Sequence, residues 1–235
     1  MIAVRPAADR GRTSLAWLDS RHTFSFGGYH DPAQMGFRTL RVINDDRVRP
    51  SQGYSTHAHR DMEILTLVLD GALEHRDSLG TGSIIRAGDA QRMTAGTGVT
   101  HSEFNPSPDA PVRFLQIWIL PERAGLIPEY EQRSFPEAAR RNRLTPIAAR
   151  DGRDDSLYLH QEAIVSLGLL DPGRSITCAS EKGGNLYLHV YGGNLELDGK
   201  RLADGDGAAA TGTAELVVRS LEGSDPARFL LFDLA

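Results

Sequence analysis

Two short motifs that place potential metal ligands at alternate positions constrain the fold of this chain more than any other feature. The first is His57-Ala58-His59, and the second, His101-Ser102-Glu103, follows after the run from Arg60 to Thr100. Alternate side chains of a β-strand point to the same face, so each motif can direct two potential ligands into one cavity. We therefore interpret Gly53–Asn105 as a small β-barrel with a metal in its mouth.

The run between the two motifs has the pattern of paired strands. Residues 62–69 are nearly all apolar and end at the turn dipeptide Asp70-Gly71, after which residues 72–75 return. A second turn, at Gly88-Asp89, precedes the second motif. The whole chain has 24 glycines and 12 prolines among short apolar segments. Turns at such short intervals predict an all-β fold.

The candidate ligands are three imidazoles and one carboxylate, from His57, His59, His101 and Glu103. Nitrogen and oxygen donors without sulfur suit iron(II), manganese, nickel, copper(II) or zinc. Four protein ligands on an octahedral ion leave two positions for a substrate, or for a substrate and O₂. A single histidine in a strand is usually a structural residue, but two paired motifs beside glycine-rich turns favour a metal site.

Other residues near the motifs are weaker candidates. Arg60 and Glu63 follow the first pair and could orient the ligands, because a metal-bound histidine needs a partner for its second ring nitrogen. They could equally be surface charges of the barrel. Phe24 and Phe26 are candidate pocket walls or core residues. The histidines without a paired neighbour are interpreted as structural: His22, His30, His75, His160 and His189.

Composition argues against several functional classes. The 235-residue chain has a formal charge of −5, which does not favour binding to nucleic acid or to an acidic membrane surface. The basic residues in Arg140–Arg143 are interpreted as a solvated face. No apolar run approaches the roughly 20 residues of a membrane span. One cysteine, Cys178, excludes an internal disulfide, is expected in the core, and fits a cytoplasmic location.

The chain is expected to contain two barrels joined by a linker. Prolines and a short helical candidate, residues 137–143, mark residues 126–150 as the linker between an N-terminal metal-binding domain (1–125) and a C-terminal domain (151–235). Residues 187–197 repeat the pattern of 65–75, and residues 202–207 repeat 85–90, so that Gly193 and Gly205 correspond to Gly71 and Gly88. This register aligns the four ligands with Ala179, Glu181, Val218 and Ser220, and predicts a metal-free second barrel.

The motifs resemble those of the cupin superfamily. The first cupin motif is matched by Gly53, His57, His59, Glu63 and Gly71, and the second by Gly88, Gly96, His101 and Asn105; Thr94 stands where a proline is usual. More narrowly, residues 56–60 and 101–105 resemble the signature of pirins and bacterial pirin-like proteins. In that family Glu103, and not Glu63, would be the carboxylate ligand. Ala58 replaces a usual proline, which leaves the donor set unchanged.

The resemblance implies a bicupin, two tandem cupin barrels (double-stranded β-helices), with iron(II) in the N-terminal barrel; copper, nickel, cobalt, manganese and zinc remain alternatives. Bacterial members are similar to quercetin 2,3-dioxygenases, which open a flavonol ring with O₂ and release carbon monoxide. By this analogy Glu103 is both ligand and catalytic proton acceptor. The expected partners are a small aromatic phenol and O₂, with no nucleic acid or membrane, and the expected state is a cytoplasmic monomer.

Two other functions stay open at this point. One is a regulatory binding protein in which the oxidation state of the metal alters a partner surface, without turnover. The other is a different cupin enzyme, such as an isomerase or a hydrolase. The first predicts tight metal binding and a partner recovered in only one oxidation state, and a screen of metabolites would reveal the second.

Overall fold

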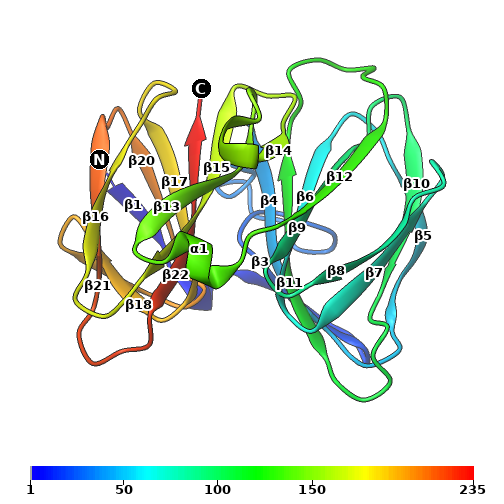
Figure 1. Cartoon of the computed structure of the whole chain (residues 1–235), viewed down its shortest axis with the longest axis horizontal. Helices are drawn as coiled ribbons and strands as arrows, with labels where there is room; N and C mark the ends of the chain where they lie inside the picture. The colour runs from blue at the N-terminus through cyan, green and yellow to red at the C-terminus, as the bar shows by residue number, and fades with distance from the viewer. Residues whose placement is uncertain (1) are drawn as a thin grey trace. The chain divides into compact units, whose positions relative to one another are not determined.

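The chain is almost entirely β, as expected from its sequence. The computed structural model describes residues 2–235. Within them lie 22 strands, one four-residue α-helix, α1 (Glu137–Arg140), and two short 3₁₀ turns, η1 (Ala7–Asp9) and η2 (Arg153–Asp155) (Figure 1). The chain divides into two compact units. We call residues 11–135 with 157–161 the first barrel, and residues 1–10, 136–156 and 162–235 the second barrel.

These boundaries differ from the expected ones. Residues 126–150, expected to be a linker, are instead divided between the two barrels, and they contain β12 (Glu129–Ser134), α1 and β13 (Arg143–Ala149). β12 pairs with β9 (Asp89–Thr94) of the first barrel, and β13 pairs with β15 (Ala163–Leu170) of the second. The first ten residues also belong to the second barrel, through β1 (Ile2–Arg5). Proline-rich composition was a poor guide here, since backbone pairing and not composition decides membership.

The first barrel is built from two antiparallel sheets. One has the order β12-β9-β6-β11-β4-β3-β2 and the other the order β5-β10-β7-β8. The short β14 (Leu157–Tyr158) also belongs to this unit. Its other strands are β2 (Gly11–Ser14), β3 (Leu18–His22), β4 (Leu40–Val48), β5 (Gly53–His59), β6 (Glu63–Asp70), β7 (Ala72–Asp77), β8 (Gly82–Arg86), β10 (Val99–Phe104) and β11 (Val112–Ile119).

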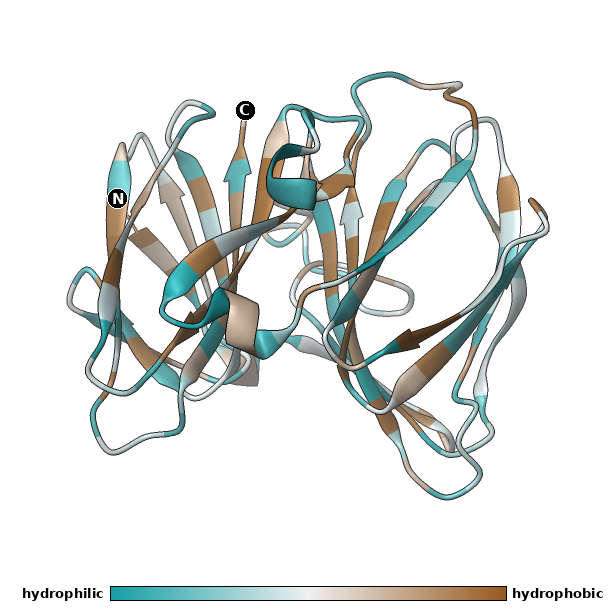
Figure 2. Cartoon of the chain, in the orientation of Figure 1, coloured by the Kyte–Doolittle hydropathy of each residue, from teal (hydrophilic) through white to brown (hydrophobic). Residues whose placement is uncertain are grey.

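Hydrophobic patterning explains the positions of these strands. The apolar run of β6 has six consecutive buried residues from its start, as expected of a strand covered on both faces. β10 alternates between buried and more exposed positions, so one face of it points inward. The core between the sheets contains Leu18, Val48, Val68, Leu73, Ile85, Val112 and Phe114. Apolar residues gather along the strands, whereas the connections are mostly polar (Figure 2).

The second barrel has a matching pair of sheets. Their orders are β1-β20-β17-β22-β15-β13 and β16-β21-β18-β19. The strands β20-β17-β22-β15 therefore take the places of β9-β6-β11-β4, and β16-β21-β18-β19 take those of β5-β10-β7-β8. The strands not yet bounded are β16 (Ser175–Ala179), β17 (Asn185–Gly192), β18 (Asn194–Leu197), β19 (Lys200–Ala203), β20 (Gly207–Thr211), β21 (Glu215–Ser220) and β22 (Ala227–Leu234).

The glycine correspondence expected from the repeat is confirmed. Gly71 and Gly193 each follow the central strand of their barrel with positive φ, 76° and 67°. Gly88 and Gly205 have φ of 89° and 88°, and each donates its N–H to the same place, the carbonyl of Val68 or of Val190. Side chains other than hydrogen rarely adopt this left-handed backbone, so glycine marks the same turn in both repeats.

The predicted alignment of the ligand positions is partly wrong. His101 lies opposite His57 in the first barrel, and Val218 lies opposite Ile176, not Ala179, in the second. Counting back from Gly193 failed because the connection from β16 to β17 is longer than that from β5 to β6. The interior of the second barrel is an apolar cluster that includes Cys178, which is a core residue as expected.

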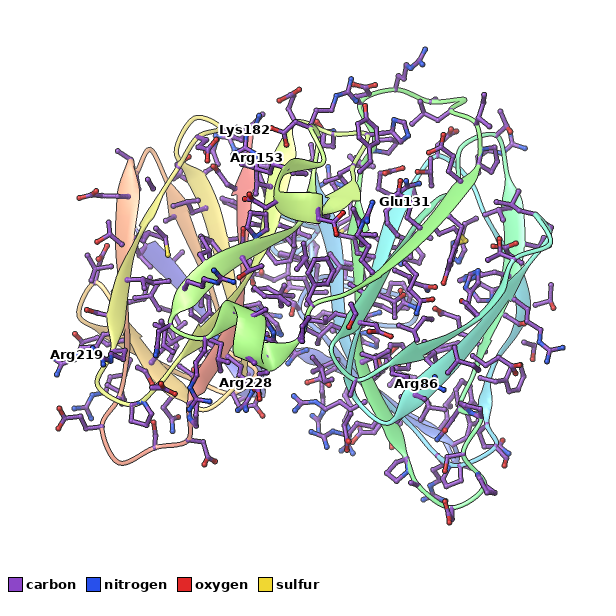
Figure 3. The ribbon with its side chains drawn as sticks, viewed as in Figure 1. Arg86, Glu131, Arg153, Lys182, Arg219 and Arg228 are labelled. Atoms are coloured by element: carbon purple, nitrogen blue, oxygen red, sulfur yellow. The ribbon has the colours of Figure 1, made fainter. Side chains whose placement is uncertain are left out.

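Ion pairs attach the short elements of the second barrel. The guanidinium of Arg228, labelled in Figure 3, lies 2.7 Å from Glu137 of α1. The helix ends at Arg140, earlier than the predicted 143, because Arg141 is already extended (φ −69°, ψ 130°). Arg153 of η2 pairs with Glu181 at 2.7 Å. No helix of residues 2–235 is long and apolar enough to cross a membrane.

Candidate metal centre

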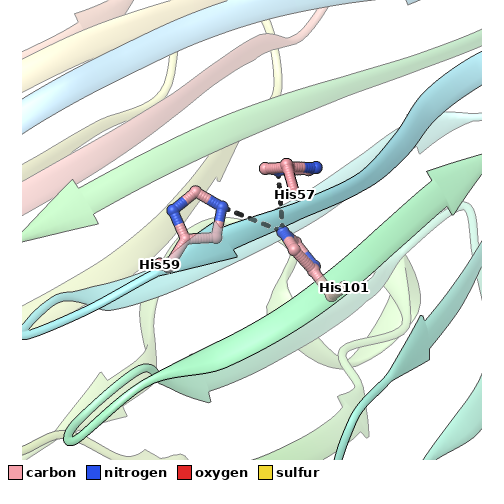
Figure 4. Close-up of side chains that lie close together, drawn as sticks. All are labelled: His57, His59 and His101. Carbon is pink, nitrogen blue, oxygen red and sulfur yellow. Dashed lines mark hydrogen bonds between the residues drawn. The ribbon is translucent and has the colours of Figure 1, made fainter.

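Three histidines converge between the two sheets of the first barrel. His57 and His59 lie on β5, and His101 lies on β10 directly opposite His57. The Nε2 atom of His101 is 3.1 Å from Nε2 of His57 and 3.0 Å from Nε2 of His59 (Figure 4). The strand argument is confirmed here, because two residues spaced i, i+2 on one strand meet one residue across the ladder.

The separations of these nitrogens fit one metal ion. Imidazole nitrogens bind transition metals at about 2.1 Å, and two that are at right angles around one ion are then about 3.0 Å apart. The contacts of His101 with His57 and His59 have that length. Sulfur-free imidazole donors of this kind suit a borderline divalent cation. These residues therefore fit a metal.

The electrostatics favour the neutral imidazoles that a metal requires. Burial, followed by the neighbouring histidines, lowers the pKa of His101 to about 2. Burial and then the charge of His57 lower the pKa of His59 to about 4. A neutral imidazole offers one lone pair, and the hydrogen-bond partner of its second nitrogen decides which atom carries it. For His57 that partner is the carbonyl of Ser55, which accepts a hydrogen bond from Nδ1 at 2.8 Å. The lone pair for a metal is then on Nε2.

Glu103 lies in the same pocket, two residues after His101 on β10. Gln116 donates to its Oε2 at 2.5 Å, and Gln91 and Thr66 donate to its Oε1 at 3.2 and 3.4 Å. Burial and then the charge of Asp46 raise the pKa of Glu103 to about 8. Its carboxylate oxygens group with nitrogens of His101 and His75, and not with the three-histidine cluster. Of the other three predicted ligands, the structure thus brings only His101 close to Glu103.

Aromatic and polar side chains form the walls of the pocket. Trp118 packs edge-on against both His59 and Phe26, with ring centroids 5.0 and 5.4 Å apart. Among the polar lining residues, the hydroxyl of Tyr54 donates to Oδ2 of Asp46 at 2.9 Å. The lining consists of Phe26, Asn44, Asp46, Tyr54, His57, His59, Ile64, His101, Glu103, Gln116 and Trp118.

Only one of the weaker candidates reaches this pocket. Phe26 lines it, whereas Phe24 is buried outside the lining. Arg60 is exposed in the connection after β5. Glu63 is buried but accepts from the backbone N–H of His160 at 3.2 Å. Its neighbour Ile64 lines the pocket, and alternation along β6 therefore turns Glu63 to the opposite face.

Sequence reasoning missed His75 and most of the polar wall. His75 was interpreted as structural, yet its Nδ1 lies 3.4 Å from Nδ1 of His101. A signal was present, because His75-Arg76-Asp77 has the same alternate spacing as His101-Ser102-Glu103. Asp46 and Gln116 come from β4 and β11, and only the pairing of those strands places them at the site. No local motif indicates them.

Two family models match the chain. The model described as Pirin matches residues 4–119, and the model described as Quercetinase C-terminal cupin domain matches residues 146–234. Together they correspond to the two repeats found in the fold. The expectation of two tandem cupin domains is confirmed by these matches and by the strand order.

Full-length relatives also match. A protein from Escherichia coli named Quercetin 2,3-dioxygenase is 43% identical, over 100% of this chain and 99% of that protein. The crystal structure of the bacterial pirin YhhW from Escherichia coli in complex with nickel(II) has a TM-score of 0.94 at 40% identity, covering 100% of this chain and 99% of that one. A structure of Quercetin 2,3-dioxygenase from Acinetobacter baumannii, 21% identical with a TM-score of 0.78, covers 98% of this chain and 84% of that one and shares the fold.

Proposed function

This chain belongs to the pirin family, and from that premise we propose that it is a metal-dependent dioxygenase. Its reaction would open the ring of a quercetin-like flavonol with O₂ and release carbon monoxide. The observation that carries the proposal is the convergence of three imidazole Nε2 atoms within a pocket walled by aromatic rings. The Escherichia coli relative named Quercetin 2,3-dioxygenase supports the choice of reaction.

The proposed ligands are His57, His59, His101 and Glu103. Nε2 of His101 already lies at the separation of neighbouring ligands from Nε2 of His57 and from Nε2 of His59, and Glu103 follows His101 on the same strand. When bound, the metal supplies Lewis-acid and redox chemistry for a reaction with O₂. We propose iron(II) as the ion; the nickel(II) complex of the related YhhW makes nickel the first alternative to test.

Glu103 is proposed as the catalytic proton acceptor. Its carboxylate faces the pocket, and the side chains that donate to it, Gln116, Gln91 and Thr66, are uncharged. They hold the carboxylate in place without neutralising it with a cation. A phenolic hydroxyl of a substrate in the pocket would transfer its proton to an oxygen of Glu103 as the substrate becomes an anion. Gln116 then keeps the protonated group in position.

The walls suit a flat aromatic substrate. Phe26 and Trp118 provide an apolar part of the lining, and the Tyr54–Asp46 pair provides a hydroxyl and a carboxylate. Aromatic faces hold a planar ring by stacking, while the polar pair can recognise its hydroxyl groups. Water is excluded from most of this surface, because Asp46, His101 and Glu103 are 1–2% exposed.

The test is turnover by protein loaded separately with iron(II) and with nickel(II). Loaded wild-type protein is expected to consume O₂ and release carbon monoxide from quercetin. His57→Ala is expected to lose both the metal and turnover. The matched control is His160→Gln, since His160 lies outside the pocket lining and contacts Glu129 at 3.4 Å; it is expected to behave as wild type. Fully loaded wild-type protein that produces no carbon monoxide would refute the proposal.

A further inference from the structure

A continuous hydrogen-bonded chain runs behind the histidine cluster. Nδ1 of His101 lies 3.4 Å from Nδ1 of His75, and Nε2 of His75 lies 2.9 Å from Oδ2 of Asp77. The side chains of His75 and Asp77 are 0% exposed, and His101 is 2% exposed. Three groups that could each bind water are therefore enclosed and satisfy one another.

Strand pairing explains why these residues meet. β10 lies between β5 and β7, and His101 is opposite His57 on one side and Asp77 on the other. His75 is opposite Glu103. The ring of His101 therefore directs Nε2 toward the other two histidines of the cluster and Nδ1 toward β7. The ring of His75 is also covered by Tyr130, with centroids 4.8 Å apart.

The direction of the hydrogen bonds follows from the role of His101. If Nε2 of His101 donates its lone pair to a metal, its proton must reside on Nδ1. Nδ1–H then donates to Nδ1 of His75, which must be unprotonated, so His75 carries its proton on Nε2. That N–H donates to Asp77, a carboxylate that only accepts. Every atom along the chain then has one consistent assignment.

Asp77, the last residue of this hydrogen-bonded chain, is held in place by a turn. Oδ1 of Asp77 accepts from the backbone N–H groups of Leu79 and Thr81 at 2.9 and 3.0 Å, which leaves Oδ2 directed at His75. The turn itself is tied to β10, because Ser78 donates its N–H to the carbonyl of Thr100 at 2.9 Å. The carboxylate therefore cannot rotate away from His75 without breaking backbone contacts.

We propose that Asp77 and His75 are positioning residues that hold His101 in the tautomer and orientation required of a metal ligand. This inference rests on the proposed metal site. The negative charge of Asp77 makes Nε2 of His101 a stronger electron-pair donor to the metal, as hydrogen-bond partners of metal-bound histidines do in general. His57 is oriented differently, because its Nδ1 donates to a backbone carbonyl instead.

The test measures metal affinity, by competition with a chromophoric chelator for nickel(II), and the Nδ1–H imidazole resonances of the zinc-loaded protein. His75→Leu removes the acceptor for His101 and is expected to lower affinity about 10- to 100-fold. His75→Asn replaces that acceptor with an amide oxygen but breaks the link to Asp77, and is expected to recover part of the loss. Asp77→Asn is expected to lower affinity and shift the His101 Nδ1–H resonance.

The control is again His160→Gln. It removes a histidine–carboxylate contact of the first barrel that is not part of the hydrogen-bonded chain of His101, His75 and Asp77. Its affinity and its imidazole resonances should match wild type. Thermal melts identify a variant that fails to fold. If His75→Leu does not fold, Asp77→Asn and His75→Asn test the proposal. Unchanged metal affinity and unchanged imidazole resonances in both of these variants would overturn the positioning role of Asp77 and His75. Wild-type protein that binds metal tightly but does not degrade quercetin would overturn only the proposed function.

Discussion

Gly53 offers a test of the site that changes none of its side chains. It is the first residue of β5, and a Cβ added to it would lie 2.1 Å from the carbonyl oxygen of Glu103 and 2.5 Å from Cα of Phe104. Ordinary contacts begin near 3.4 Å, so Gly53→Ala must separate the strands by about 1 Å. Because β10 is held by β7 on its other side, the edge strand β5 is the one expected to move.

The movement of β5 should reach the ligands it carries. His57 is four residues from Gly53 on the same strand, and metal–ligand distances tolerate only about 0.2 Å. A third of the displacement at Gly53, about 0.3 Å, already exceeds that tolerance. We expect Gly53→Ala to lower nickel(II) affinity at least about 10-fold and to cost about 1–3 kcal/mol of stability, as overpacking typically does.

Chelator competition and urea unfolding measure these two quantities. The matched control is Gly82→Ala, because Gly82 lies on β8 of the same sheet and an added Cβ meets nothing within 4 Å. That variant should bind metal as wild type does. If Gly53→Ala had wild-type affinity and stability, the argument that close contact between β5 and β10 sets the ligand geometry would be wrong.

Three further predictions concern the two barrels. His101→Ala should lose metal in elemental analysis yet keep a cooperative thermal melt, because the apolar core carries the fold. Phe229→Ala, at a fully buried position of the second barrel, should cost about 3–5 kcal/mol in urea unfolding and leave nickel(II) affinity unchanged. Burial raises the pKa of Glu103 to about 8 from an ordinary 4.5, so the metal-free folded protein keeps a proton that the unfolded chain releases. The contribution of Glu103 to stability should therefore fall as pH rises from about 4.5 to 8, and urea unfolding of Glu103→Gln over this range should lack that dependence.

The parts of the site that lie on one strand were predictable from the sequence. His57 and His59 share a face because strand residues alternate, and the glycines at 71, 88, 193 and 205 mark equal turns because each needs a positive φ. Asp46, Gln116 and Trp118 were not predictable, since they reach the pocket through pairing between β4, β11 and β6. The equivalent of His57 in the second barrel was misplaced because the length of a connection has no fixed relation to register.

The position of β5 at the edge of its sheet has a consequence for how an ion would arrive and leave. β5 carries His57 and His59, both half-buried, while the enclosed His101 sits on the interior strand β10. A border strand is bonded on one side only, so it can fray without unfolding the core beneath it. Exchange of the ion with solution would then be governed by local unfolding of β5. A chelator could remove the metal from a protein that is otherwise folded, on a timescale much shorter than global unfolding.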